Sequence, residues 1–345
     1  MNKLLLIDGS SLLSTSFFGN LPATYFKART EEEKAQALKK VLKTSTGIFT
    51  NGVFTMTKAL LNLIEKQEPT HIVVAWDVSR NTFRRKAYEG YKANRGVTAP
   101  ELSAQFGVMQ ELLAAMKIPQ FMFEEYEADD IIGTFAKQFE QEIPTYILTK
   151  DQDALQLVSE YTRLWLMTSK AKEMYTELQI ETKTLKIPDN VFEYTPLYVE
   201  EFYGVTPIQI IDKKALEGDS SDNIPGVKGV GPKAVGPLLN EFGTVEEIYE
   251  YIENTSEKEA KEFFKELGIR SPLAALLKED DHELVGKQAA FLSKQLATIN
   301  TQIEELSEVQ LTDLVLKVDY EAMLLKFREL EFKSLVEQME KKLSA

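Results

Sequence analysis

Residues 3–8 read Lys-Leu-Leu-Leu-Ile-Asp, and residues 71–77 read His-Ile-Val-Val-Ala-Trp-Asp. In each stretch a short apolar run ends on an aspartate. A third run, residues 145–149, reads Thr-Tyr-Ile-Leu-Thr and precedes Lys150 and Asp151. Runs of this length and composition are typical of buried strands in a parallel sheet. Because such sheets bind ligands beyond the carboxyl ends of their strands, the pattern brings three carboxylates to one edge of the sheet.

Other acidic residues come in pairs two or three positions apart. Asp151-Gln-Asp153 and Asp219-Ser-Ser-Asp222 are two such pairs, and Glu127-Ala-Asp-Asp130 opens an apolar helical segment. A single aspartate after a strand is often only a helix N-cap or a turn residue. The helix dipole favours an anion at a helix start, but three carboxylates in one first turn exceed what capping requires. The candidate metal ligands are Asp8, Asp77, Glu127, Asp129, Asp130, Asp151, Asp153, Asp219 and Asp222.

Carboxylates gathered in one crevice would repel one another strongly unless cations neutralised them. Oxygen ligands without nearby histidine or cysteine suit Mg²⁺ or Mn²⁺ rather than zinc. The sequence therefore predicts a divalent-metal site at the edge of the sheet.

The composition is that of a soluble globular protein. The 345 residues, 43% of them hydrophobic and 27% charged, are enough for one large domain or two moderate ones. The absence of cysteine excludes disulfides, thiolate zinc sites and a thiol nucleophile. The chain shows neither a signal peptide nor an apolar run of about 18 residues, so we expect a cytoplasmic protein without membrane contact.

The net charge of −14 is unevenly distributed along the chain. Residues 78–98 hold six basic residues against the single acid Glu89. Within them, Tyr88-Glu-Gly-Tyr-Lys-Ala-Asn-Arg95 mixes aromatic rings with cations, which suits an unpaired nucleic-acid strand. A solvated loop is the alternative. The basic patches favour a nucleic-acid partner near the acidic site.

Glycines and lysines alternate in a second basic motif, Gly226-Val-Lys-Gly-Val-Gly-Pro-Lys233. Glycines at this spacing let backbone N–H groups point outward at a helix start, where phosphate binds favourably. The motif is typical of a helix–hairpin–helix that grips a DNA backbone without reading its sequence, with a plain glycine turn as the alternative. The candidate DNA-binding residues here are Gly226, Lys228, Gly229, Gly231 and Lys233.

Residues 1–200 alternate strand-like runs with helical patterns, which predicts an α/β domain with a mainly parallel central sheet flanked by helices. A crossover or arch is expected at about residues 78–110, above the sheet edge. Residues 201–270 are expected to form the helix–hairpin–helix region, and residues 271–345 a C-terminal helical region.

Local patterns add detail to this division. Arg163–Met167 has the composition of a strand, and Asn190–Pro196 is predicted to be a linker. Thr30-Glu-Glu-Glu33 is a capping box that opens a helix. The last segment, Tyr320–Leu343, has an amphipathic helical pattern that favours packing rather than function.

Taken in order, these motifs resemble the 5′ nuclease domain of bacterial DNA polymerase I, a family that includes phage 5′ nucleases and flap endonucleases. The match extends to Phe291–Thr298 and Leu330–Leu335 and so covers nearly the whole chain. The residues that carry it are Asp8, Phe83-Arg84, Tyr91-Lys92, Tyr126–Asp130, Thr149–Asp153 and Gly218–Gly231.

The resemblance implies a PIN-like fold and metal-dependent removal of 5′ flaps and 5′ ends in primer removal, replication and repair. The implied substrates are DNA with flaps, nicks or 5′ ends, RNA-primed ends among them. The polymerase module is missing, so we expect a monomeric, stand-alone bacterial nuclease that acts with a separate polymerase. Residues Tyr25–Ile48 look longer than in polymerase I.

The resemblance also implies roles for single residues. Two Mg²⁺ ions would act at the scissile phosphate, the first held by Asp8, Asp77, Glu127 and Asp129, and the second by Asp130, Asp151, Asp153 and Asp222, with Asp219 acting through water. Arg84 and Lys92 would draw the phosphate onto the metals, while Arg95 and Tyr91 hold the displaced strand. In the family the hairpin also holds K⁺ through backbone carbonyls, which here would be those of Gly226, Val227 and Val230.

Three alternatives remain open. A PIN-like ribonuclease would share the acidic core but would normally lack the Gly226–Lys233 motif. A non-catalytic or weakly active DNA-binding relative would have no reason to fill nine acidic positions. A phosphatase with Asp8 as nucleophile would want a second aspartate at Ser10, and that aspartate is absent.

Overall fold

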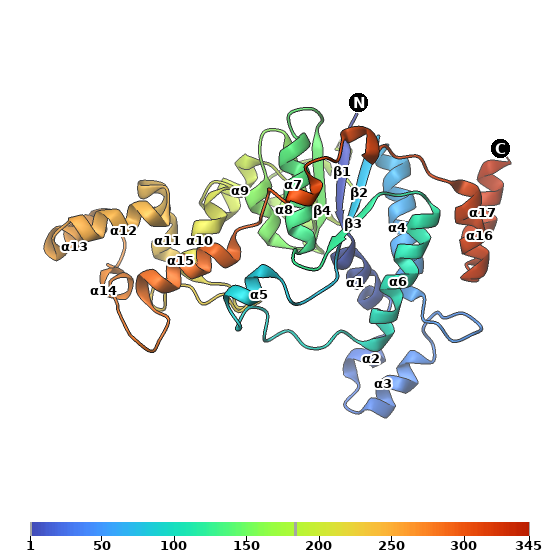
Figure 1. Cartoon of the computed structure of the whole chain (residues 1–345), viewed down its shortest axis with the longest axis horizontal. Helices are drawn as coiled ribbons and strands as arrows, with labels where there is room; N and C mark the ends of the chain where they lie inside the picture. Colours follow the sequence, from blue (N-terminus) through green and yellow to red (C-terminus); the bar gives the residue numbers. More distant parts are fainter. Residues whose placement is uncertain (1, 183–184, 345) are drawn as a thin grey trace.

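The computed structural model describes residues 2–182 and 185–344. A six-stranded sheet lies at its centre, in the order β3-β2-β1-β4-β5-β6 (Figure 1). Only β6 runs antiparallel to its neighbour, so the prediction of a mainly parallel α/β sheet is confirmed. The strands are β1 Leu4–Asp8, β2 His71–Asp77, β3 Gln120–Phe123, β4 Thr145–Thr149, β5 Thr162–Met167 and β6 Val191–Tyr194.

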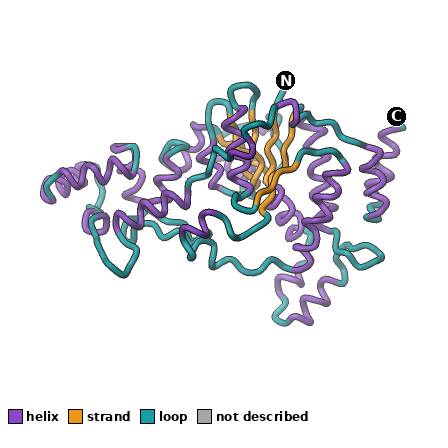
Figure 2. The backbone as a smooth tube through the Cα atoms, viewed as in Figure 1, coloured by secondary structure: helices purple, strands orange, loops and turns teal. Residues whose placement is uncertain are grey.

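The central strands are mostly apolar because helices cover both faces of the sheet. Alternate residues of β1 enter different cores: Leu4 and Leu6 pack into one cluster with α7, and Leu5 and Ile7 into the other with α1, α4 and α6. Figure 2 shows the strands enclosed between helices. Leu4 pairs with His71 on one side and Thr145 on the other, so the strands end together at one edge.

Helices make up most of the remaining described chain. The α-helices are α1 Gly9–Gly19, α2 Ala23–Lys27, α3 Glu31–Leu38, α4 Asn51–Gln67, α5 Phe83–Ala87, α6 Pro100–Ala115, α7 Ala128–Phe139, α8 Ala171–Glu177, α9 Pro196–Tyr203, α10 Gln209–Glu217, α11 Pro232–Phe242, α12 Val245–Asn254, α13 Glu257–Glu266, α14 Leu273–Leu276, α15 Gly286–Ala297, α16 Tyr320–Glu329 and α17 Lys333–Leu343. The 3₁₀ helices are η1 Gln152–Leu157, η3 Glu304–Leu306 and η4 Leu311–Leu314. No helix among the described residues is both long and apolar enough to cross a membrane.

The predicted helix–hairpin–helix is present: α10 and α11 flank the glycine motif. Gly226 has a left-handed φ of +63°, and a Cβ there would come within 2.3 Å of the Gly218 nitrogen. The turn therefore requires glycine at this position. Val227 and Val230 are buried beneath the turn, while Lys228 and Lys233 are exposed.

Two sequence predictions are wrong in detail. Asn190–Pro196 is not a linker, because β6 pairs with β5 and Pro196 begins α9. The segment Tyr320–Leu343 is two helices rather than one, and Glu331, with φ of +59°, lies at the break. Both helices pack into the core cluster that contains α4 and α6. The predicted strand Arg163–Met167 is confirmed within β5.

The segment Tyr25–Ile48 contains most of α2 and all of α3. Thr30 caps α3 by accepting a hydrogen bond from the Glu33 N–H, as the capping box predicts. Near its C-terminal end the segment is attached to the turn between α16 and α17, where the Ser45 N–H donates to the Glu331 carboxylate.

Candidate active site at the carboxyl ends of the strands

A cleft of about 1290 Å³ opens where the parallel strands end. It lies between the strand ends, the crossover that contains α5, and the loop after α10. Seven of the nine predicted metal ligands line it: Asp8, Asp77, Glu127, Asp129, Asp151, Asp153 and Asp219. The predicted convergence of carboxylates from separate strands is therefore present.

The strand-end aspartates cap helices and also face the cleft. One Asp8 oxygen accepts from the Ser11 N–H at 2.8 Å, and the other accepts from the Thr149 hydroxyl at 2.7 Å. Asp77 accepts from the Ala128 N–H at 2.9 Å, at the start of α7. Capping and metal binding are thus not alternatives here, because a carboxylate oxygen has a second lone pair to offer.

The three acids at the start of α7 have different surroundings. Glu127 and Asp130 form a reciprocal capping box. Asp129 lies between them, and its buried Oδ1 has no hydrogen-bond partner among the described residues. A buried carboxylate oxygen without a donor is costly unless a cation compensates it.

The acids of the cleft disfavour one another's charge. Burial, together with the neighbouring charge of Asp77, raises the pKa of Asp8 to about 7. Burial and the charge of Asp151 likewise raise the pKa of Asp153 to about 7. The pKa of Asp129 is raised well above its ordinary value by burial and by Asp151, Asp8 and other acids. Side chains from three strand ends and from α7 are therefore close enough to interact electrostatically.

The side chains fit a divalent cation in their chemistry. Within residues 2–182 and 185–344, no three acidic or histidine side chains are already arranged as a complete metal-binding group. The Asp129 oxygen without a hydrogen-bond partner and the raised pKa values of Asp8 and Asp153 nevertheless indicate that the site lacks compensating positive charge. Oxygen ligands of this kind suit Mg²⁺ or Mn²⁺.

A lysine that the sequence analysis missed lies among the acids. Lys214 of α10 pairs with Asp153 and, at 2.6 Å, with Asp219. Burial raises the pKa of Asp219, but hydrogen bonds from Lys214 and Ser221 outweigh it and leave the pKa at about 2. Lys214 precedes Asp219 by five residues. Only the knowledge that α10 ends at the cleft would have marked it as a site residue.

The crossover carries three of the predicted residues, Tyr91, Lys92 and Arg95, to the same cleft. The Lys92 ammonium lies 2.8 Å from Glu127 and 3.5 Å from Asp222, and Arg95 pairs with Asp222. The crossover is joined to the hairpin loop by the Lys92 N–H, which donates to the Asp222 carbonyl at 2.8 Å. Asn94 donates to the Ser220 carbonyl at 2.7 Å. The basic crossover and the second acidic pair are thus positioned together.

Tyr91 does not fit its predicted role of stacking on a displaced strand. Only 4% of its surface is exposed, and its ring packs beside Ile224 and Leu296. Its hydroxyl donates toward Glu127 at 3.1 Å or Asp222 at 3.4 Å. A ring enclosed in this way cannot present a face to a base, whereas its hydroxyl can orient one of the two carboxylates at a time.

Arg84 and Asp130 also lie apart from their predicted positions. They form a buried bidentate pair at 2.7 and 2.8 Å, and neither lines the cleft. Asp130 accepts in addition from the backbone N–H groups of Glu127 and Asn300, which uses four acceptor positions of the carboxylate. Arg84 donates its other N–H groups to the carbonyls of Leu296 and Thr298. The geometry is that of a structural clamp between α5, α7 and the end of α15.

Two family models match the chain. Residues 3–185 match the 5′-3′ exonuclease N-terminal resolvase-like domain. Residues 205–321 match the 5′-3′ exonuclease C-terminal SAM fold.

Curated relatives include whole nucleases and longer polymerases. The chain is 34% identical to a 5′-3′ exonuclease of Halalkalibacterium halodurans over 91% of this chain and 88% of that protein. It is 36% identical to DNA polymerase I of Bacillus caldotenax over 98% of this chain, and this match covers 32% of the polymerase. The chain therefore spans about a third of the length of such polymerase relatives.

Solved structures share the fold. T5 5′-exonuclease with bound divalent zinc superposes with a TM-score of 0.57 at 18% identity, over 87% of this chain and 91% of that chain. A bacteriophage T5 D15 flap endonuclease in complex with DNA and metal ions gives a TM-score of 0.55 at 17% identity, over 96% and 100%.

Proposed function

The chain belongs to the 5′-3′ exonuclease family, as its resemblance to the polymerase I 5′ nucleases predicted, and from this premise we propose that it cuts DNA at 5′ flaps, nicks and 5′ ends with two divalent metal ions. The observation that carries the proposal is the convergence of Asp8, Asp129 and Asp153. Burial raises the pKa values of all three, and the charges of neighbouring acids, Asp77 for Asp8 and Asp151 for Asp129 and Asp153, raise them further.

The candidate metal ligands are proposed to form two groups. Asp8, Asp77, Glu127 and Asp129 would hold one Mg²⁺, and Asp151, Asp153 and Asp222 the other, while Asp219, which Lys214 holds at 2.6 Å, would act through water. Asp130 is left out of the second group, because Arg84 and two backbone amides already occupy its oxygens. When bound, the two ions would polarise the attacking water and offset the charge that develops on the phosphate.

Lys92 and Arg95 are the cations best placed to act on the phosphate. Both lie against site carboxylates at the mouth of the cleft, and Arg95 keeps 46% of its side chain exposed. A phosphate that enters beside Glu127 and Asp222 would meet both cations. Tyr91 would act as a positioning residue that holds the Glu127 or the Asp222 carboxylate through its hydroxyl.

The helix–hairpin–helix is the proposed grip on the duplex. Lys228 and Lys233 are exposed, and no ion pair engages either one among the described residues. The carbonyls of Gly226, Val227 and Val230 would hold K⁺ in the same turn, where Gly226 is already fixed by a hydrogen bond from its N–H to Ser293. The finer expectations, namely RNA-primed ends, a monomer, a cytoplasmic location and a separate polymerase partner, remain proposals.

The test is cleavage of a 5′-flap DNA by the purified chain with Mg²⁺ and with excess chelator. We expect cleavage only with the metal, and none from Asp153→Asn. Binding of the same flap in Ca²⁺ should survive in that variant, since Ca²⁺ coordinates more loosely. Wild-type turnover by Asp153→Asn, or cleavage in chelator, would refute the metal assignment.

A further inference from the structure

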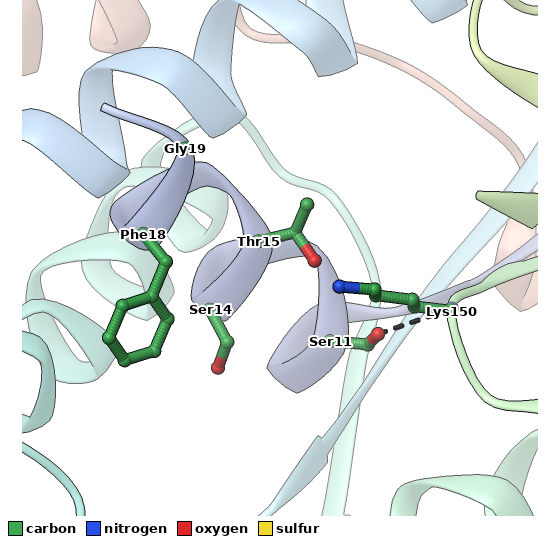
Figure 3. A pocket seen from close by; sticks show the side chains of 6 residues that line it. All are labelled: Ser11, Ser14, Thr15, Phe18, Gly19 and Lys150. Carbon is green, nitrogen blue, oxygen red and sulfur yellow. Dashed lines mark hydrogen bonds between the residues drawn. The ribbon is translucent and has the colours of Figure 1, made fainter. Parts of the chain in front are cut away.

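A second, smaller cavity of about 330 Å³ adjoins the acidic cleft along α1 (Figure 3). Its lining residues are Ser11, Ser14, Thr15, Phe18, Gly19 and Lys150. Ser11, Ser14 and Lys150 also line the cleft, so the two spaces share a wall. The volume lies in the usual range of about 300–1,000 Å³ for small-molecule sites.

Lys150 differs from the other cations of the cleft. Lys92, Arg95 and Lys214 pair with site carboxylates. Arg80 and Arg85, the remaining two, donate to backbone carbonyls. The ammonium of Lys150 has neither a carboxylate nor a hydrogen-bond partner in the part of the chain that the structure describes.

The backbone of Lys150 is nevertheless held in place. Its N–H donates to the Ser11 hydroxyl at 3.2 Å, and its side chain extends along α1 toward Thr15 in Figure 3. An unpaired cation in a strongly acidic chain, fixed at its base and directed into a cavity, is suited to an anion that comes from outside.

The rest of the cavity suits the other parts of a nucleotide. The hydroxyls of Ser14 and Thr15 make no hydrogen bond to described residues, so both are available as donors to a phosphate. Phe18 exposes 41% of its surface, and an edge contact with Phe17 at 5.1 Å supports its ring. An exposed aromatic face beside unpaired donors is the combination that binds a base and a phosphate together.

The position of the cavity indicates which nucleotide it would take. Lys214 and Asp219 line the cleft on the side of α10, which leads to the hairpin proposed to hold the duplex. Helix α1 leads away from β1 in a different direction, toward α2, whereas α10 and α11 lie to the left of the sheet in Figure 1. A strand with its scissile phosphate in the cleft and its duplex on the hairpin would continue along α1.

We propose that this cavity is a nucleotide subsite for the strand on the side of the cut away from the duplex, with Lys150, Ser14 and Thr15 on a phosphate and Phe18 against a base. The inference rests on the proposed function. It assigns the subsite to the part of the substrate that is released.

The test is a chemical double-mutant cycle on a 5′-flap DNA. Neutral methylphosphonates replace, one at a time, the three phosphates on the flap side of the cut, and flap affinity is measured in Ca²⁺ for wild type and Lys150→Ala. We expect Lys150→Ala to weaken binding about 3- to 10-fold and to lower the salt slope by about 0.7, the value for one single-strand phosphate contact. At one of the three positions, the methylphosphonate should not weaken flap binding by Lys150→Ala any further, because the contact that it removes is already lost in the variant.

Phe18 is tested in the same way. An abasic residue next to the coupled phosphate should weaken flap binding by wild type several-fold. It should not weaken flap binding by Phe18→Ala, because this variant has already lost the ring on which the base would stack. The control is Lys172→Ala, which replaces an exposed lysine on α8. This variant should bind every substrate as wild type does.

Two outcomes separate this inference from the proposed function. Additive effects of Lys150→Ala and of the methylphosphonate at all three positions would overturn the subsite, while Mg²⁺-dependent cleavage by wild type would leave the nuclease assignment intact. Coupling at one position in a wild type that does not cleave would support the subsite and refute the proposed chemistry.

Discussion

Asp130 is buried and Asp153 partly buried in the same region, but their partners predict opposite effects of the same substitution. Asp153 has a pKa raised to about 7 by burial and by Asp151, so its charge is disfavoured without a metal. Asp130 is fully buried against the Arg84 guanidinium and holds it bidentately. Replacing Asp153 by asparagine removes its repulsion with Asp151 along with its pairing to Lys214. Replacing Asp130 removes the carboxylate that holds Arg84 bidentately and leaves this buried guanidinium with Glu127, 3.5 Å away, as its one charged partner among the described residues.

We therefore expect Asp130→Asn to destabilise the fold by about 3 kcal/mol, the cost of breaking a buried ion pair. Asp153→Asn should leave the free energy of unfolding unchanged or higher while it abolishes cleavage. Urea unfolding of both variants in chelator checks this difference. An Asp130→Asn variant with wild-type stability but no cleavage would restore Asp130 to the metal ligands.

Lys92 is expected to act in the cleavage step rather than in binding. Its ammonium lies 2.8 Å from the Glu127 carboxylate. Burial lowers the pKa of Lys92, but the negative charges of Glu127 and Asp222 outweigh burial and raise the pKa well above its ordinary value. It therefore stays charged at any working pH. Lys92→Ala should lower the single-turnover rate about 10²-fold or more, as for loss of a group that stabilises developing charge.

The discriminating comparison is single-turnover cleavage at saturating enzyme beside flap binding in Ca²⁺. Binding should change far less than the rate, since several other cations hold the substrate. Wild-type cleavage by saturated Lys92→Ala would make Lys92 a docking residue and would transfer the catalytic role to Arg95.

At the scale of elements, hydrogen bonds join the hairpin between α10 and α11 to the crossover before α6, and we propose that the two segments bind the substrate together. The crossover is held to the hairpin loop through Lys92, Asn94 and Asn223, the last of which donates to the Gly90 carbonyl at 2.7 Å. Lys92 and Asn223 both adopt left-handed backbone conformations there, with φ of +53° and +56°. The cations proposed to act on the scissile phosphate and those proposed to hold the duplex are thereby fixed relative to each other.

Lys228 and Lys233 should affect affinity without affecting chemistry or sequence preference. Each alanine variant should lower the slope of log affinity against log salt by about 0.9, the value for one duplex phosphate contact. Binding of a plain duplex across a salt series measures it, with Lys172→Ala as the matched surface control. An unchanged slope together with lost turnover would place these lysines in the active site.

At the scale of the whole molecule, the acidic cleft links stability to pH and to metal. The folded protein keeps protons on Asp8 and Asp153 up to about pH 7, whereas the unfolded chain releases them near 3.8. Between these values the folded state binds more protons than the unfolded state, so the contribution of these groups to stability falls as the pH rises. Divalent metal should restore that stability, because it binds the deprotonated acids.

We expect the metal-free protein to melt at a lower temperature at about pH 8 than at about pH 5, and Mg²⁺ to raise the melting temperature more at the higher pH. Asp153→Asn should show a shallower dependence on pH than wild type. Thermal melts in chelator and in Mg²⁺ measure both effects. A Mg²⁺ stabilisation equal at the two pH values would contradict the linkage.

Much of the fold and of the site could be predicted from the sequence because the deciding patterns are local. An apolar run followed by an aspartate fixes both the strand and the edge at which its carboxylate lies, as β1 with Asp8 and β2 with Asp77 show. The glycine motif fixes the hairpin, since only glycine tolerates the conformation of Gly226. A strand that is buried on both faces needs a short apolar run, and a tight turn needs glycine at one position. Both requirements involve only a few neighbouring residues, so both can be recognised in the sequence.

Which acids are free to bind metal was decided only by the tertiary structure. The partners that occupy Asp130 lie far away in the sequence: Arg84 is 46 residues distant and Asn300 is 170. The lysine that pairs with Asp153 is 61 residues away, and Tyr91 is buried by contacts with Ile224 and Leu296. Long-range pairs of this kind leave no periodic signal in the sequence, because a carboxylate that holds a metal and one that holds a buried arginine are the same residue until the chain folds.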